Sequence, residues 1–176
     1  MKYRIGEEND EIIKNKFHVD FTVRNPRLWR CNGMGEQNLY DFTVELVKDG
    51  KVITSDTKRI GIRTVRLEQE KDKWGRSFRF ILNGVPVFAK GVNVIPFDNI
   101  LTNVTSETYR KHLEPAVEAN MNMVRGWGGG IYETDEFYDL CDSLGIMVWQ
   151  DFIFACTMYP SEGQLLETMK QEFADN

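Results

Sequence analysis

The chain has 176 residues, of which 41% are hydrophobic and 12% aromatic, so it is long enough for one ordinary domain or two small ones with a buried core. The formal net charge is −5 and the 22 basic residues are scattered, which argues against nucleic acid and against an anionic membrane surface as partners. The apolar runs fall short of the roughly 20 residues of a membrane span, and the polar start, 1–15, lacks the apolar core of a signal peptide.

The cysteines indicate the cellular compartment. Cys31, Cys141 and Cys156 form an odd set without CxxC spacing, which argues against a disulfide framework and against a zinc site. We therefore expect free thiols, and with no visible signal peptide they favour a cytoplasmic location. No pattern in the chain indicates a cofactor or a bound metal.

Alternating apolar residues predict β-strands in the first half of the chain. The segments "FHVDFTV" at 17–23 and "YDFTVELV" at 40–47 place apolar side chains at every second position, as half-buried strands do. Asp49-Gly50 and Asn83-Gly84 tolerate the positive φ of a tight hairpin turn. Short strands separated by turns predict an immunoglobulin-like β-sandwich, but only about five strands are visible where such a sandwich uses roughly seven. We expect residues 1–82 to hold an incomplete sandwich.

After Val87 the pattern becomes typical of an α/β fold. "VFAKGVNV" is continuously apolar, which predicts a strand covered on both faces, and "MNMVRGW" and "IMVWQDF" predict a second and a third strand. Between them we expect a helix over 105–119, capped by Thr105 or Ser106 and bent at Pro115, and another over 134–144 that stops at Gly145.

Alternating strands and helices predict a parallel sheet with helices outside it. A closed barrel of eight such units takes about 250 residues, and only about 90 remain after Val87. The second half, 83–176, is therefore either a small open sheet or the opening portion of a (β/α)8 TIM barrel.

Polar and planar side chains gather where these three strands end. Asn93 and Asp98 follow the first strand, Arg125 and Trp127 the second, and Asp151 the third. Functional residues of parallel α/β folds lie at the carboxyl ends of the strands. A guanidinium, an amide and a carboxylate facing an indole are the groups that recognise a sugar. We predict that these five residues bind substrate.

Each residue also has an interpretation without a ligand. Arg125 could pair only with a neighbouring carboxylate, Trp127 and Trp149 could fill the core, and Asp151 could cap a helix. The glycines at 128–130 match neither GxGxxG nor GxxxxGK[ST], so we interpret them as letting backbone pass close beneath Trp127 rather than as a phosphate loop.

Three segments together resemble β-mannosidases of glycoside hydrolase family 2: "LWRCNGMGEQNLYDFTVEL", "LNGVPVFAKGVNVIPFD" and "EANMNMVRGWGGGIYETDEFYDLCDSLGIMVWQDFIFACTMYP". The resemblance implies an immunoglobulin-like sandwich that precedes a TIM barrel, with the join near 80–87. It also implies retaining hydrolysis of terminal β-linked mannose from oligosaccharides. One departure is Trp29-Arg30-Cys31, where the family usually has Trp-Trp-Pro.

The resemblance also implies what this chain does not carry. Retaining hydrolysis needs two carboxyl groups about 5 to 5.5 Å apart, which in the family are glutamates after barrel strands four and seven, the first in an Asn-Glu motif. This chain has no Asn-Glu pair after its third strand, and its later glutamates are Glu162, Glu167 and Glu172. We therefore predict a fragment of a β-mannosidase that has no catalytic residue of its own and is inactive alone.

Two other functions stay open at this stage. The chain could be a non-catalytic carbohydrate-binding or interaction module, or it could come from another family 2 glycosidase such as a β-galactosidase or β-glucuronidase. Galactosidase relatives typically show His-Tyr-Pro after the matching arginine, so "RGWGGG" favours the mannosidase. An interrupted barrel would leave the third strand with unpaired backbone groups and the helices without half of their apolar cover, and we therefore expect the chain to self-associate.

Overall fold

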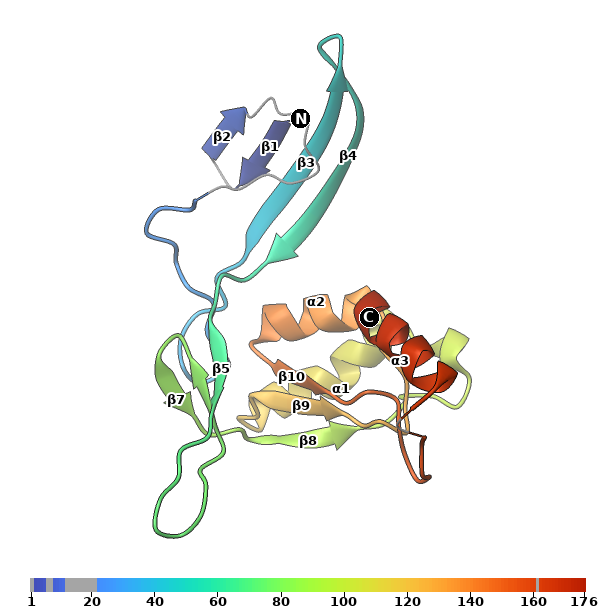
Figure 1. Cartoon of the computed structure of the whole chain (residues 1–176). Coiled ribbons are helices and arrows are strands. Elements are labelled where there is room, and N and C mark those ends of the chain that lie inside the picture. Colours follow the sequence, from blue (N-terminus) through green and yellow to red (C-terminus); the bar gives the residue numbers. More distant parts are fainter. Residues whose placement is uncertain (1, 6–7, 12–21, 161) are drawn as a thin grey trace. The chain divides into compact units, whose positions relative to one another are not determined.

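The computed structural model describes residues 2–5, 8–11, 22–160 and 162–176. The chain divides into two compact units, Met1–Phe88 and Ala89–Asn176. Strands form the regular structure described in the first unit, and strands alternate with helices in the second (Figure 1). The assignment of 1–82 and 83–176 to particular domain families stays a prediction.

A four-stranded antiparallel sheet begins the first unit, in the order β2-β1-β3-β4. Its strands are β1 (Lys2–Ile5), β2 (Glu8–Glu11), β3 (Tyr40–Lys48) and β4 (Lys51–Ile60). The strand predicted over 40–47 is confirmed as β3, whereas the one predicted at 17–23 falls largely outside the described residues. Strands β1 and β2 lie in the start that we took as merely polar, because "KYRI" and "ENDE" carry little apolar alternation.

A second antiparallel sheet has the order β5-β6-β7, with β5 (Val65–Glu68), β6 (Arg79–Leu82) and β7 (Val85–Val87). Both predicted turns are confirmed. Asp49 and Gly50 have φ of 51° and 75° between β3 and β4, and Asn83 and Gly84 have φ of 50° and 80° between β6 and β7. Positive φ at both central residues is the conformation of a type I′ hairpin.

The core of the first unit forms around Trp29, whose side chain is almost fully buried. Its N–H donates to the carbonyl of Ile62 at 3.0 Å, and its carbonyl accepts from Nδ2 of Asn83 at 2.9 Å. Cys31 is fully buried beside it in the sequence, so the segment that departs from the family pattern is core. Every residue of strand β4 is exposed. Among the described residues, no second sheet therefore covers this strand.

The second unit contains a three-stranded parallel sheet in the order β10-β9-β8, with β8 (Gly91–Val94), β9 (Met123–Gly126) and β10 (Met147–Gln150). This confirms three neighbouring parallel strands. The prediction of one continuous, fully covered strand in "VFAKGVNV" is wrong. Val87 pairs antiparallel with Phe80 in β7, the strand pairing then stops, and Gly91 pairs parallel with Met123 in β8. Strand β8 is an edge of the sheet and is largely exposed.

The helices of this unit are α1 (Ser106–Glu118), α2 (Asp135–Leu144) and α3 (Gln164–Asp175), with a short 3-10 helix, η1 (Leu101–Asn103). Thr105 caps α1 in a capping box with Thr108, and Pro115 lies within α1, as predicted. Helix α2 ends at Gly145, whose φ of 77° is the left-handed conformation expected of a helix stop.

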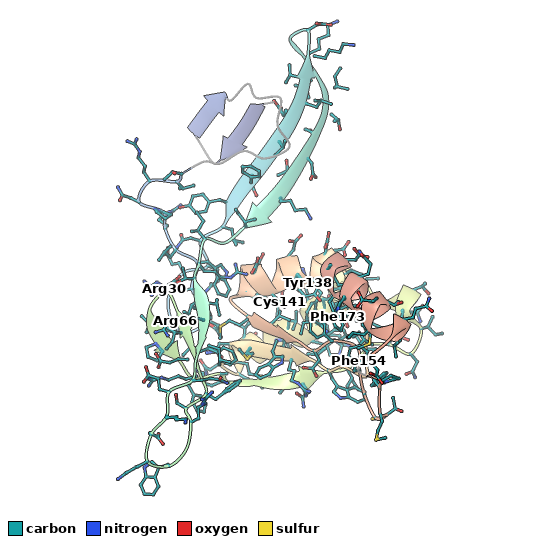
Figure 2. The ribbon with its side chains drawn as sticks, viewed as in Figure 1. Arg30, Arg66, Tyr138, Cys141, Phe154 and Phe173 are labelled. Carbon is teal, nitrogen blue, oxygen red and sulfur yellow. The ribbon has the colours of Figure 1, made fainter. Side chains whose placement is uncertain are left out.

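Helices α1 and α2 pack on one face of the sheet (Figure 1). Tyr109 and Leu113 from α1 and Phe137 from α2 form a buried cluster with Val124 of β9. The two helices predicted over 105–119 and 134–144 are thereby confirmed. Helix α3 is held instead through Phe173, whose ring centroid lies 3.7 Å from that of Phe152 in a stacked pair and 5.6 Å from that of Phe154, which it meets edge-on. Figure 2 labels Phe173 and Phe154. Within the residues described, no helix is long and apolar enough to span a membrane.

Candidate functional site

The register of the parallel sheet brings three predicted or considered residues into one row. Asn93 of β8 and Trp149 of β10 both pair with Arg125 of β9. Paired residues of neighbouring strands project to the same face of a sheet, and successive residues alternate between faces. Since Val124 packs against the helices, Asn93, Arg125 and Trp149 project from the opposite face.

Arg125 and Asp151 form a two-pronged ion pair at the carboxyl end of the sheet. Nε of Arg125 donates to Oδ1 of Asp151 at 3.1 Å, and Nη2 donates to Oδ2 at 2.5 Å. Nη1 donates to Oδ1 of Asn93 at 3.2 Å. Three of the five N–H donors of the guanidinium are used in these bonds, which leaves two for a ligand. The side chains of Arg125 and Asp151 are 39% and 20% exposed, so the pair is accessible.

The backbone around β9 also holds Asp151. Its N–H donates to the carbonyl of Gly126 at 3.0 Å, and its Oδ2 accepts from the N–H of Gly128 at 3.2 Å. A carboxylate held by a guanidinium and a backbone N–H has little freedom to turn. The simple interpretation of Asp151 as a helix cap is wrong, because its carboxylate bonds to Arg125 and to the loop after β9.

The loop after β9 places Trp127 over glycine. A Cβ built on Gly129 would lie 2.2 Å from Cη2 of Trp127, and one on Gly128 would lie 2.6 Å from the carbonyl oxygen of Phe152. Both positions therefore exclude a side chain unless neighbouring atoms move. This supports our interpretation that the glycines allow close backbone passage beneath Trp127, which is itself partly exposed.

The hydrogen bond described for Asp98 does not involve Arg125, Asp151 or Asn93. Its Oδ1 accepts from the N–H of Ile100 at 2.7 Å, which is a local turn that an aspartate commonly forms. A sugar-binding role for Asp98 stays a prediction. The structure thus brings Arg125, Asp151 and Asn93 into direct contact, with Trp127 on the loop that follows.

Trp149, for which core filler was one possible interpretation, lies outside the core. We considered it as core filler, but it is 40% exposed and lies beside Arg125 in the sheet. Alternation within "IMVWQDF" could have located it, because Val148 faces the helices and its neighbour must face away. A hollow of about 380 Å³ on this side is lined by Gly91, Asn93, Met123, Arg125 and Trp149, among others.

A second polar group lies next to the loop, at Glu133. Its Oε2 accepts from the hydroxyl of Tyr109 at 2.9 Å. Burial raises the pKa of the Glu133 carboxyl, and the bond from Tyr109 opposes this shift in part. Glu133 was not predicted, since nothing in "GGGIYET" marks it as partly buried.

Chemically, the site offers fixed hydrogen-bond donors and acceptors beside two indole rings, which suits a neutral polyhydroxyl ligand. Among the residues that the structure describes, there is no group of three or more His, Cys, Asp or Glu side chains that could hold a metal ion.

Comparisons with known proteins show which proteins this chain is similar to. Residues 2–63 match the family described as Glycosyl hydrolases family 2. The chain is 44% identical over 168 residues to β-mannosidase B of Aspergillus terreus, and this alignment covers 96% of this chain and 20% of that protein. It is 49% identical over 163 residues to β-mannosidase B of Aspergillus flavus, and this alignment covers 93% of this chain and 19% of that protein.

A solved structure is similar over nearly the whole chain. The crystal structure of β-D-mannosidase from Dictyoglomus thermophilum matches with a TM-score of 0.87 and 43% identity, covering 97% of this chain and 22% of that one. The chain thus spans about a fifth of the length of the relatives that it matches.

Proposed function

Because the chain belongs to glycosyl hydrolases family 2 and is homologous to β-mannosidases over nearly its full length, we propose that it supplies part of the sugar-binding site of a retaining β-mannosidase. The whole protein would remove terminal β-linked mannose from oligosaccharides. The residues proposed to contact the sugar are Arg125, Asp151, Asn93 and Trp127, together with Asp98, which lies between β8 and η1.

One observation carries this proposal: the guanidinium of Arg125 is fixed between Asp151 and Asn93 at the carboxyl ends of three parallel strands. The hydroxyl groups of a pyranose need donors and acceptors at fixed angles, and its apolar ring face needs an aromatic surface. The remaining N–H donors of Arg125 and the ring of Trp127 supply both kinds of contact.

At the level of domains, we infer that residues 1–82 belong to an immunoglobulin-like sandwich and that 83–176 begin a (β/α)8 TIM barrel. Antiparallel strands with type I′ hairpins support the first assignment. Three parallel strands with intervening helices on one face support the second, because helices cover the outside of such a barrel.

The bond-breaking carboxylates are proposed to lie outside this chain. Two candidates within it, Glu167 and Glu172, lie on α3, where Glu167 pairs with Lys170 and Glu172 accepts from Tyr132. Neither glutamate forms a described hydrogen bond with Arg125, Asp151 or Asn93. We expect the chain alone to leave a chromogenic β-mannoside intact, whereas turnover that Glu172→Gln abolishes would contradict the assignment.

A chimera tests the function directly. The segment of the Dictyoglomus thermophilum β-D-mannosidase that matches this chain would be replaced by the chain itself, which is 43% identical to it. We expect the chimera to hydrolyse a p-nitrophenyl β-mannoside faster than the matching β-galactoside or β-glucuronide. A folded chimera, judged by circular dichroism, that prefers either of the other glycosides would overturn the proposal.

The non-catalytic alternative predicts a different result. A carbohydrate-binding module should bind mannose as the isolated 176-residue chain, whereas part of a composite site should bind it weakly because much of the site is missing. Titration calorimetry of the chain with mannose and with β-mannobiose separates the two. Micromolar binding by the chain alone would favour the module.

We also propose that the isolated chain self-associates through the β8 edge. Val92 and Ile95 are 47% and 63% exposed there. They line a hollow of about 380 Å³ together with Phe97, Leu113 and Ala116, among others. An edge strand beside an apolar hollow is a surface that a soluble chain tends to cover.

A further inference from the structure

A series of hydrogen bonds leads from α2 to the group formed by Arg125, Asp151 and Asn93. The hydroxyl of Tyr138 donates to Oε1 of Gln150 at 3.1 Å, and Nε2 of Gln150 donates to the backbone carbonyl of Asp151 at 2.9 Å. Asp151 then receives the two bonds from Arg125. Tyr138 and Gln150 each donate to the next group, whereas Asp151 accepts from both sides. The amide of Gln150 accepts through its oxygen and donates through its nitrogen, which defines how the amide is turned.

From this geometry we infer that Tyr138 is a positioning residue for the Arg125–Asp151 pair, and that it acts through the amide of Gln150. The inference rests on the proposed function only for the identity of the ligand. Neither Tyr138 nor Gln150 is among the residues proposed to touch the sugar.

The two sides of the sheet explain why such a connection is needed. Gln150 pairs with Gly126 across β10 and β9, one position beyond Trp149 and Arg125. Its side chain therefore lies on the helix side, whereas the carboxylate of Asp151 bonds to Arg125. The amide of Gln150 holds the carbonyl of Asp151, and the N–H of Asp151 bonds to Gly126. The two bonds fix the backbone of Asp151, which sets the direction of its carboxylate.

Space for this arrangement comes from Gly126. A Cβ built there would lie 2.6 Å from Oε1 of Gln150. Any larger residue at this position would displace the amide from its bond to Tyr138. The glycine thus has a steric role that is separate from the glycines of the following loop.

Tyr138 is suited to hold the amide because it is itself held. Its ring meets Phe137 edge-on at 5.3 Å, and it packs against the buried cluster between α1, α2 and the sheet. Figure 2 labels Tyr138 on α2, near Cys141 of the same helix. Burial raises the pKa of the Tyr138 hydroxyl, so the hydroxyl keeps its proton and remains a donor at neutral pH.

The first test uses the chain itself and needs no activity. Exchange of the Arg125 Nε–H with solvent is measured by nitrogen-15 NMR in the unchanged chain, in Tyr138→Phe and in Tyr132→Phe. Tyr132 is the matched control, because its hydroxyl donates to Glu172 at 3.4 Å, outside this connection. We expect Tyr138→Phe to speed exchange about fivefold, the factor for one neutral hydrogen bond, and Tyr132→Phe to leave it unchanged. Equal rates in all three proteins would overturn the inference.

The second test uses the chimera with the Dictyoglomus thermophilum enzyme and a double-mutant cycle. Tyr138→Phe should lower kcat/KM several-fold when Arg125 is present and should have no further effect after Arg125→Ala. A merely structural role would give the same loss in both backgrounds, and that result would contradict positioning. If the parent chimera is inactive on β-mannosides, the proposed function fails, while the exchange measurement still decides this inference.

Discussion

Asn122 and Lys90 form two hydrogen bonds with each other at the amino ends of β9 and β8. The N–H of Asn122 donates to the carbonyl of Lys90 at 2.8 Å, and Oδ1 of Asn122 accepts from the N–H of Lys90 at 2.9 Å. The carbonyl of Asn122 also accepts from the N–H of Met147 at the start of β10. One buried residue, 3% exposed, therefore connects the beginnings of three strands whose other ends carry the candidate site.

Asn122→Ala should destabilise the second unit by about 1 kcal/mol, because it removes the partly buried hydrogen bond that Oδ1 of Asn122 accepts from the N–H of Lys90. The free energy of unfolding is measured in urea by helical circular dichroism, since the described helices lie in that unit. Asn99→Ala, at an exposed position, serves as the control and should change it by no more than about 0.5 kcal/mol. Equal effects of the two substitutions would contradict this role for Asn122.

Arg125→Lys should lower kcat/KM of the chimera on a β-mannoside by about tenfold or more. Lysine keeps the charge but cannot bond to both oxygens of Asp151 and to Asn93 at once. Arg110→Lys is a matched control, because Arg110 pairs with Glu114 at 3.1 Å on the exposed side of α1 and should leave kcat/KM unchanged. An active Arg125→Lys chimera with parental kinetics would show that the planar guanidinium is dispensable.

The thiols should differ sharply in reactivity. Cys31 and Cys141 are buried and Cys156 is exposed, and burial raises the pKa of the Cys141 thiol to about 12. Since the thiolate is the reactive form, we expect one rapidly titrated thiol in the folded chain at pH 8 and three after denaturation. Cys156→Ser should remove the rapid reaction. A second fast thiol in that variant would mean that the core around Cys31 or Cys141 opens readily.

Glu133 should make stability fall as the pH rises. Burial raises its folded-state pKa above the ordinary value of 4.5, so the folded state binds the proton more tightly than the unfolded state does. Its stabilising contribution is full below pH 4.5 and is lost as the pH rises through the folded-state pKa. Glu133→Gln should therefore remove a decline in the melting temperature above pH 4.5.

Glu136 provides a control of opposite sign. The hydrogen bond from Thr134 lowers the pKa of its carboxyl, so its contribution is present above pH 4.5 and is lost as the pH falls through the lowered pKa. Glu136→Gln should thus flatten the acid side of the profile. Identical profiles for the two glutamine variants would contradict both assignments.

Self-association should depend on Val92. We expect sedimentation velocity of the isolated chain to show a concentration-dependent oligomer, which Val92→Lys weakens by placing a charge at the β8 edge. Val52 in β4 is 53% exposed, and Val52→Lys is the matched control. If Val52→Lys dissociates the oligomer and Val92→Lys does not, the association runs through the first unit. A monomer at all concentrations would refute self-association.

Many turns and helix ends could be predicted from the chemistry of one or two neighbouring residues. The turns at Asp49-Gly50 and Asn83-Gly84, the cap at Thr105 and the stop at Gly145 each depend on the conformations that one or two residues tolerate. The boundary after Val87 was harder to predict. An apolar run looks the same whether one strand continues or two strands meet, and only the partners, Phe80 for β7 and Met123 for β8, distinguish these cases.

The sequence by itself determined that Arg125, Asn93 and Asp151 follow parallel strands, because alternation and helix periodicity are properties of neighbouring residues. Only the tertiary structure decided that they touch, since contact depends on the register of strands some 30 residues apart. It also decided that Trp149 lies beside Arg125 and that Tyr138 reaches Gln150. Side chains on separate elements meet only after packing sets the distance between them, and no local pattern encodes that distance.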